Sequence, residues 1–246
     1  MALTPDELER HKRHILLKEI GGPGVQKLQA ASVSIVGAGA LGGPCALYLA
    51  AAGVGQIELW DDDVVDRSNL QRQIQFGEGE VGQPKTTILK HRMNAQNPTV
   101  TVLERPVRFD DSSHLTGDVL IDASDNFETR FALNKIGHDT GRVLVSGAAA
   151  RWSGQVAVFA SGVDPSAPCY RCLVPDLPPD AEACDEVGVV GALTGQIGSL
   201  MALEVIKLIT GAGEPLIGRL QIIDALAGTI RVLKLRPNPD CQVCSA

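Results

Sequence analysis

A glycine-rich stretch near the N-terminus has the spacing of a phosphate-binding turn. Gly37, Gly39 and Gly42 form a G-x-G-x-x-G pattern within SIVGAGALGGP. An apolar run precedes the pattern and CALYLAAAG follows it, which predicts a strand, a turn and a helix in that order. Amide groups at such a helix N-terminus bind phosphate. The pattern therefore predicts a nucleotide site, for a redox cofactor or for ATP, with close packing of small residues as the alternative.

Acidic residues follow the next predicted strand, in the segment ELWDDD. Asp61 ends that strand and Asp63 lies two residues further on. An acidic residue about 20 residues beyond a glycine turn holds the ribose hydroxyls in dinucleotide-binding folds. We expect both aspartates to line the nucleotide site.

Cationic and amide side chains come next along the chain. Asn69, Arg72 and Gln73 lie in DRSNLQRQIQF, and Lys85 ends GQPK at the head of a predicted helix. A pyrophosphate that already rests on a glycine turn needs no such surplus of cations, which favours a longer anion such as a triphosphate. A solvated charged loop is the alternative.

Two further aspartates end the fourth predicted strand, in VLIDASDNFETR. Asp122 and Asp125 lie where parallel strands present their carboxyl ends, which is the usual ligand-binding edge. The carboxylate of Asp125 is a candidate ligand for a magnesium ion that bridges phosphates. The alternative is that Asp125 or Asn126 caps the helix that follows.

Four of the six cysteines form two C-x-x-C pairs, CYRC and CQVC. Four thiolates are enough for a closed tetrahedral zinc site, and the residues concerned are Cys169, Cys172, Cys241 and Cys244. The pairs lie further apart than in a zinc ribbon, and a redox pair is the rival interpretation. Two such pairs favour structural zinc, which would fix the loop over 166–190 to the C-terminal segment. Cys45 is expected to be a small buried hydrophobe, and Cys184, in the loop, is a weaker candidate nucleophile.

The elements that would position these residues alternate in type. Helices are predicted at residues 5–19, 25–31, 41–52, 85–96, 126–140 and about 192–210, with a break at 21–24. Strands are predicted at 32–36, 56–61, 99–104, 118–122, 142–147 and 154–160, and two more join at a turn over 226–228. This order predicts an α/β fold: a Rossmann-like, mostly parallel sheet, extended by antiparallel strands in the C-terminal half, with helices on both faces. We expect a single domain over 1–246, with a helical arm at about 1–31, a nucleotide-binding half at about 32–147 and a C-terminal half at about 148–246.

Composition excludes several classes of protein. The 246 residues are 44% hydrophobic, which is enough for a sizeable core, and the net charge of −7 gives no basic footprint for nucleic acid. The apolar runs are interrupted by glycine and charge, and the N-terminus has no apolar signal segment. We expect a cytoplasmic protein that binds neither nucleic acid nor membrane.

Together, these motifs resemble the ThiF/MoeB/HesA family, bacterial relatives of the ubiquitin-activating enzymes. The resemblance covers nearly the whole chain and rests on IVGAGALGGP, DDDVVDRSNLQRQ, VGQPK, DASDN, VSGAAARWSGQV, PCYRCL, IGSLMALEVIK and NPDCQVC. It implies ATP-dependent adenylation of the C-terminal glycine carboxylate of a ubiquitin-like sulfur-carrier protein that ends in Gly-Gly. The products would be an acyl-adenylate and pyrophosphate, ahead of thiocarboxylate formation for molybdenum cofactor or thiamin.

The resemblance also implies roles for individual residues. The glycines would frame the phosphate turn and Asp61 would hold the ribose, while the remaining contacts would come from Asn69, Arg72 and Lys85 to the triphosphate and from Asp125 to Mg²⁺. Arg13 matches an arginine that the family lends to the neighbouring subunit, which implies a homodimer. Cys184 matches a position that in some members attacks the adenylate or links to sulfur. Here His11 and His14 replace an aromatic residue and an amide of the family's usual pattern.

Two other functions remain open from the sequence. One is an NAD(P)-dependent oxidoreductase, which the cations and the cysteine pairs disfavour. The other is a non-catalytic nucleotide-binding scaffold. Since the chain ends two residues after Cys244, the sulfur is expected to come from a separate donor, such as a cysteine desulfurase or a sulfurtransferase.

Overall fold

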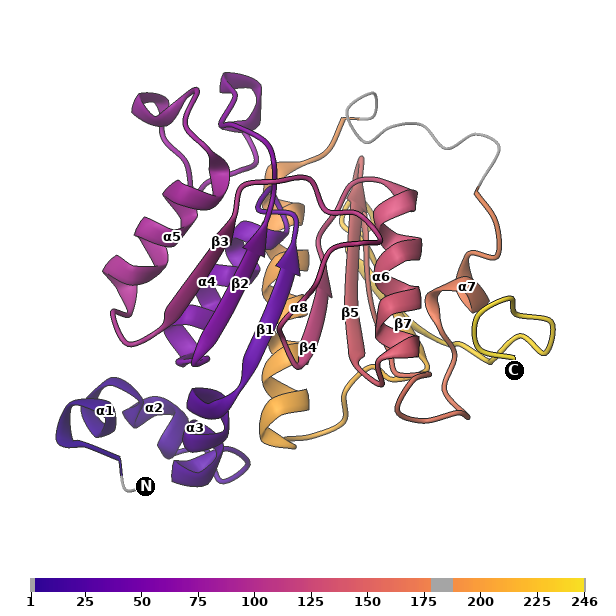
Figure 1. Cartoon of the computed structure of the whole chain (residues 1–246), viewed down its shortest axis with the longest axis horizontal. Coiled ribbons are helices and arrows are strands. Elements are labelled where there is room, and N and C mark those ends of the chain that lie inside the picture. The colour runs from indigo at the N-terminus through magenta and orange to yellow at the C-terminus, as the bar shows by residue number, and fades with distance from the viewer. Residues whose placement is uncertain (1–2, 178–187, 246) are drawn as a thin grey trace.

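In the computed structural model, which describes residues 3–177 and 188–245, eight strands form one mixed sheet between two layers of helices (Figure 1). The strands are β1 (Ser32–Val36), β2 (Gln56–Trp60), β3 (Thr101–Arg105), β4 (Val119–Asp122), β5 (Val143–Ala150), β6 (Ser153–Phe159), β7 (Arg219–Asp224) and β8 (Thr229–Lys234). The helices are α1 (Pro5–Arg10), α2 (Lys12–Ile15), α3 (Gly21–Ala30), α4 (Gly42–Ala52), α5 (Lys85–Gln96), α6 (Phe127–Asp139), α7 (Tyr170–Leu173) and α8 (Gly191–Thr210), with short 3₁₀ turns at η1 (Arg67–Asn69) and η2 (Glu78–Glu80).

The strand order is β3-β2-β1-β4-β5-β6-β7-β8. The first five strands of that order are parallel, and the last three join them through antiparallel pairs. The predicted fold class is therefore confirmed. The chain crosses from β1 to β2 through α4 and then back across the sheet to β4, so the edge above β1 and β4 is the switch point where α/β sheets bind ligands.

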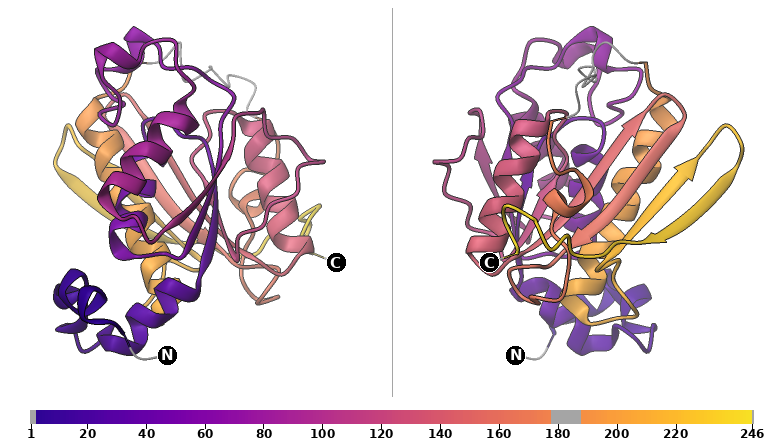
Figure 2. Two further views of the ribbon diagram at one scale, coloured as in Figure 1. Left: turned by 60° about the vertical axis from the view of Figure 1, so that its left-hand side comes forward. Right: turned by 90° about the vertical axis from the view of Figure 1, so that its right-hand side faces the viewer.

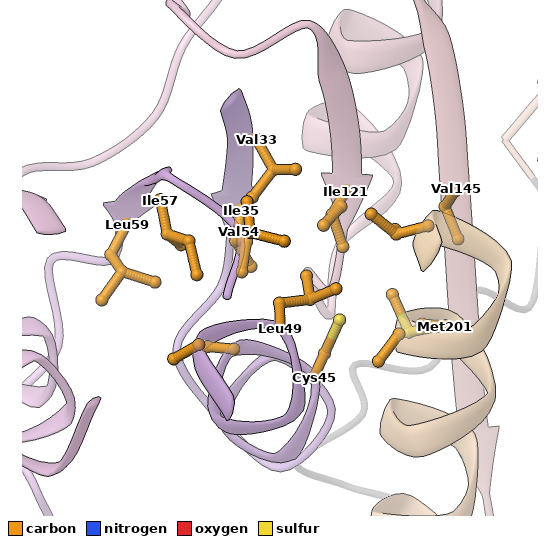
Figure 3. Close-up of a cluster of buried hydrophobic side chains, with 14 of the residues drawn as sticks. Val33, Ile35, Cys45, Leu49, Val54, Ile57, Leu59, Ile121, Val145 and Met201 are labelled. Atoms are coloured by element: carbon orange, nitrogen blue, oxygen red, sulfur yellow. The ribbon is translucent and has the colours of Figure 1, made fainter. Parts of the chain in front are cut away.

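Side chains from each parallel strand alternate between the two faces of the sheet. Val33, Ile35, Ile121 and Val145 lie on the face that α4 and α8 cover, where they pack with residues such as Met201 (Figure 3). The next residues along the strands, including Leu120 and Leu144, point to the opposite face, which α6 covers. Both faces are therefore buried, as parallel strands require.

The N-terminal arm differs from the prediction. One helix was expected over 5–19, but α1 ends at Arg10 and α2 begins at Lys12. The chain breaks because His11 is buried against Gly53, the left-handed C-cap of α4; a Cβ at Gly53 would lie 2.6 Å from His11 Cε1. The expected break at 21–24 is also wrong, since α3 begins at Gly21. Figure 1 places α1–α3 at the end where the parallel strands begin.

Helix α8 is, among the described residues, long and apolar enough to cross a membrane by length and composition. It instead packs against α3, α4, β5 and β6, and it buries Leu193, Ile197, Met201 and Val205. These contacts make it a core helix. At the far edge of the sheet, every residue of β8 is exposed, and the β7–β8 hairpin extends beyond the body of the molecule (Figure 2).

Candidate active site

The glycine turn between β1 and α4 lies at the carboxyl edge of the parallel strands. Gly37 has a φ of +98°, and a Cβ there would lie 2.5 Å from the carbonyl oxygen of Ala123. A Cβ on Gly42 would lie 1.8 Å from the carbonyl oxygen of Gly37. Close backbone packing therefore requires both glycines. The close packing of small residues, which the sequence analysis gave as the alternative to a nucleotide site, is thus one reason for this glycine pattern. Gly39 is less crowded, with 3.3 Å from its missing Cβ to Gln73 Nε2.

The backbone of this turn leaves amide groups available to a ligand. The N–H of Ala38 donates to Asp61 Oδ2 at 2.6 Å. No acceptor exists among the described residues for the N–H groups of Gly39, Ala40 and Leu41, and all three residues line a cavity. The positive end of α4 points into the same region. An anion is the ligand that this arrangement stabilises.

The cavity has a volume of about 350 Å³. It brings together most of the residues that the sequence singled out, namely Gly37, Gly39, Asp61, Asp63, Arg72, Gln73, Lys85, Asp125 and Asn126. They come from the ends of β1, β2 and β4, from the segment around η1, and from the start of α5. Residues more than 80 positions apart in the chain thus share one cavity.

Lys85 and Asp63 form the shortest ion pair described at this cavity. Lys85 Nζ lies 2.7 Å from Asp63 Oδ2, and the lysine side chain is only 5% exposed while that of the aspartate is 66% exposed. Asp61 accepts from the N–H groups of Ala38 and Asp63. Burial raises the pKa of Asp61 above its ordinary value, although Lys85 and the two amide donors oppose that shift. Asp61 is thus a desolvated carboxylate whose charge depends on its neighbours.

Asn126, and not Asp125, caps helix α6. The side chain of Asn126 accepts from Thr129 N at 2.9 Å. Asp125 is exposed at the cavity wall, and its Oδ1 accepts a 3.3 Å hydrogen bond from Asn126 Nδ2. The capping alternative therefore does not account for Asp125, which is exposed at the cavity wall.

Four described residues that the sequence singled out do not line the cavity. Asp122 is buried, and its carboxylate accepts from the side chains of Arg130 and Ser146. Gly42 lies beneath it in the first turn of α4, and the side chain of Asn69 is engaged in capping η1, where it accepts from Asp66 N at 3.3 Å. Arg13 is exposed on α2, at the opposite edge of the sheet (Figure 1). Cys184 lies outside the described residues.

The cavity also contains charged residues that the sequence analysis did not select. Arg130 is 6% exposed, and its guanidinium donates to Asp122 Oδ2 at 3.3 Å and to the carbonyl oxygen of Ser124 at 2.6 Å. It therefore holds the segment that leads to Asp125. The sequence feature that could have identified Arg130 is its position in the first turns of a helix that follows a strand ending in aspartate. Arg108 is exposed on the cavity wall, in an irregular segment with no pattern that would identify it.

The four paired cysteines meet at one place, between α7 and the C-terminal segment. The Sγ–Sγ distances are 4.0 Å for Cys169–Cys172, 3.5 Å for Cys169–Cys241 and 3.4 Å for Cys172–Cys244, and all four sulfurs lie within 4.8 Å of one another. The backbone N–H of Asn238 donates to Cys172 Sγ at 3.3 Å. Cys45 is separate and buried in the core, where burial raises the pKa of its thiol to about 12.

Residues 11–243 of the sequence match the model of the ThiF family. Among curated proteins, the chain is 43% identical to a sulfur carrier protein adenylyltransferase from Thermus thermophilus, with 99% of this chain and 93% of the relative covered. It is 42% identical to a SAMP-activating enzyme E1 from Haloferax volcanii, with 99% and 91% covered.

Longer relatives and solved structures also match. The chain is 42% identical to an adenylyltransferase and sulfurtransferase MOCS3-1 from Zea mays, of which it covers 53%. The crystal structure of E. coli MccB with MccA-N7isoASN superimposes with a TM-score of 0.85 at 22% identity, over 97% of this chain and 75% of that chain. At that identity the superposition supports the fold alone.

Proposed function

The chain belongs to the ThiF family, and from this premise we propose that it is an adenylyltransferase for a ubiquitin-like sulfur carrier. In this reaction ATP activates the C-terminal glycine carboxylate of the carrier, and the products are an acyl-adenylate and pyrophosphate. Relatives that match over nearly their full length are named for carrier adenylation and for SAMP activation. Neither a nicotinamide-dependent oxidoreductase nor a non-catalytic scaffold finds support among these relatives.

The observation that carries the proposal is the charge arrangement of the cavity. Unpaired loop amides, the N-terminus of α4, Arg72 and the buried Lys85 surround one space, and Asp61 lies at the end of β2 beside them. A ribose and a chain of phosphates present hydroxyls to the carboxylate and oxygens to the cations. No hydride-transfer chemistry requires that many cations.

The chemistry needs charge neutralisation more than proton transfer. The carrier carboxylate is already an anion, and one of its oxygens attacks the α-phosphorus while the bond to pyrophosphate breaks. Negative charge grows on the phosphate oxygens, so Lys85, Arg72 and the loop amides act as preorganised electrostatic stabilisers. We assign Asp125 to a Mg²⁺ ion, which would supply further neutralisation of the phosphates when bound. Its exposed carboxylate at the cavity wall fits a hard cation.

We assign the cysteine cluster to one structural Zn²⁺. A tetrahedron with Zn–S bonds of about 2.3 Å has edges of about 3.8 Å, and the three sulfur separations given above, 3.4–4.0 Å, bracket that value. Four sulfurs would fill the coordination shell and leave no position for a substrate. The site would then tie α7 to the C-terminal segment.

The remaining assignments concern assembly and partners. We propose a homodimer in which Arg13 enters the neighbouring subunit's site, because α2 lies at the edge of the sheet opposite to its own cavity. The helical arm, the nucleotide-binding half and the C-terminal half would act as one cytoplasmic adenylation domain. A separate protein would donate sulfur, and Cys184 remains a candidate for that later step.

The test is ATP–pyrophosphate exchange with purified carriers that end in Gly-Gly. Exchange should require both ATP and the carrier, and a carrier that lacks its last glycine is the matched control. NAD⁺ and NADP⁺ should neither bind nor compete with ATP. A lack of carrier-dependent exchange across sulfur carriers of the molybdenum-cofactor and thiamin pathways would overturn the proposal.

A further inference from the structure

Gln75 lies beneath the glycine turn and contacts it from the side away from solvent. Its side chain is 5% exposed, and Nε2 donates to the carbonyl oxygens of Ala38 at 3.1 Å and Gly39 at 2.9 Å. A glutamine amide has two donor hydrogens, so both are used on this turn. The reversed amide would place oxygen against two carbonyl oxygens, which fixes the orientation seen here.

The packing around Gln75 shows that this contact is built into the fold. A Cβ on Gly43 would lie 2.2 Å from Gln75 Nε2 and 2.3 Å from Cδ. The amide therefore occupies the space that a side chain at position 43 would fill in the first turn of α4. The N–H of Gly43 donates to the carbonyl oxygen of Gly39 at 2.9 Å, so that oxygen accepts from the helix and from Gln75 together.

These bonds fix the peptide planes of the turn. Ala38 is held on both sides, since its N–H donates to Asp61 and its carbonyl accepts from Gln75. With the carbonyls of Ala38 and Gly39 directed toward Gln75, the following N–H groups remain available at the cavity. Rotation of either peptide would instead cost a buried hydrogen bond.

Gln75 also connects the turn to the cationic side of the cavity. Its carbonyl oxygen accepts from Arg92 Nε at 3.4 Å, and Arg92 lies on α5, the helix that begins at Lys85. Arg92 in turn pairs with Glu80 at 2.8 Å. The side chain of Gln75 thus holds the amides of the site, while its backbone contacts the helix that carries the lysine.

We propose that Gln75 is a positioning residue that holds the glycine turn in its anion-binding conformation before nucleotide arrives. The role in catalysis rests on the proposed function, because the anion is taken to be ATP. The effect on the turn itself does not depend on that assignment. Preorganised donors need no rearrangement at the moment of binding, which is the advantage such a residue gives.

The test compares Gln75→Met with Asn97→Leu. Methionine keeps the length of the side chain and removes both donors. Asn97 is the matched control because it is fully buried and its Nδ2 donates to the carbonyl oxygen of Ala50, near the other end of the same helix, at 2.8 Å. Each variant loses a buried amide that holds one end of α4, and only one of those ends faces the cavity.

Amide hydrogen exchange in nucleotide-free protein gives the first readout. Gln75→Met should speed exchange at the hydrogen-bonded amides of this turn, those of Gly37 and Ala38, and leave the C-terminal end of α4 unchanged, and Asn97→Leu should do the reverse. Titration with a non-hydrolysable ATP analogue gives the second. We expect the Kd to rise roughly three- to tenfold in Gln75→Met, as for the loss of about one hydrogen bond, and to stay within about twofold in Asn97→Leu. The KM for ATP should rise with the Kd, and kcat should change less.

A second variant guards against misfolding of the first. Gly43→Ala displaces the glutamine amide while it raises intrinsic helix propensity, so the same loosening at Gly37 and Ala38 is expected in a protein whose helix is no weaker. Unchanged exchange at these two amides in both variants, or equal increases of Kd in Gln75→Met and Asn97→Leu, would overturn the inference. A wild-type protein that binds no ATP, but whose turn loosens in Gln75→Met, would overturn the proposed function and leave the positioning role standing.

Discussion

Replacing Lys85 with methionine should slow adenylation by a factor of about 10²–10³, the scale of losing one preorganised donor at a developing charge. Methionine keeps the buried hydrocarbon stem and removes only the ammonium group. The lysine side chain is 5% exposed and its Nζ lies 2.7 Å from Asp63 Oδ2, so a water that enters the variant would supply no fixed positive charge in its place. The loss should appear in kcat as well as in kcat/KM, because the charge on the phosphates increases in the transition state.

The same substitution should leave the protein folded. Lys85 loses a partner that is itself 66% exposed, and water can solvate Asp63 once the ammonium is gone. Removal of a desolvated cation offsets the loss of the pair, so we expect the free energy of unfolding to change by no more than about 1 kcal/mol. Thermal denaturation without nucleotide checks this part of the prediction.

Lys90→Met is the matched control for the assay. Lys90 is on the same helix, and its Nζ lies 3.1 Å from Glu104 Oε1, with both side chains about one-third exposed. It does not line the cavity. Pyrophosphate exchange should therefore stay within about twofold of wild type, as expected for a surface ion pair. Exchange by Lys85→Met within threefold of Lys90→Met would refute the electrostatic role.

Three further predictions follow from the cavity and the cysteine cluster. Cys241→Ser should release zinc and lower Tm, and it should change the Kd for ATP little. Metal analysis should find one zinc per chain in the wild type and in the buried control Cys45→Ser. An absence of zinc from the wild type would contradict the site. Mixing Arg13→Ala with Lys85→Met chains should give mixed dimers with one intact site of two if the arginine acts in trans, which is about half of wild-type activity per mixed dimer and about a quarter for an equimolar mixture that pairs at random. Activity that stays low in the mixture would place the arginine in its own subunit. Burial raises the pKa of Asp61, and only the ionised carboxylate accepts from both ribose hydroxyls. As pH decreases, the affinity for ATP should therefore begin to fall at a higher pH than it would with an aspartate of ordinary pKa. The affinity for 2′,3′-dideoxy-ATP, which has no ribose hydroxyls, should lack this pH dependence. Parallel pH profiles for the two nucleotides would argue against a role of Asp61 in holding the ribose.

The elements that the sequence predicted well have local signals at their ends. Helix α5 has the predicted bounds, 85–96, because Pro84 stands just before it and Pro98 disfavours helical backbone at Asn97. The alternation of strands and helices along the chain predicted a mostly parallel sheet with helices on both faces, and the parallel strands are buried on both faces. The arm was mispredicted because the break at His11 comes from a contact with Gly53, more than 40 residues away, which no local pattern contains.

The residues of the candidate site also divide into those with a local sequence signal and those without one. Asp61 and Asp125 could be selected because residue type and position at the carboxyl ends of strands indicate a ligand edge. Lys85 could be selected because it stands at the head of a helix, after a segment of cationic and amide side chains. Gln75 could not be selected, because its role depends on the space left by Gly43 and on two backbone carbonyls, neither of which a sequence displays. The cysteine pairs were selected by residue type and by their C-x-x-C spacing, and the fold brings the two segments, about 70 residues apart in the chain, together.

The exposed strand β8 has a consequence for how the protein is handled in solution. No strand in the described part of the chain pairs with its outer edge, so backbone donors and acceptors are open there, and Ile230 and Val232 are more than half exposed on the strand. Open edges of this kind recruit strands from other molecules, and natural sheets oppose this with charge. Arg231 and Lys234 supply that charge here. Salt screens such repulsion, so concentrated stocks of the protein remain dispersed best at low ionic strength, and neutral residues at these two positions would turn the hairpin into a nucleus for aggregation.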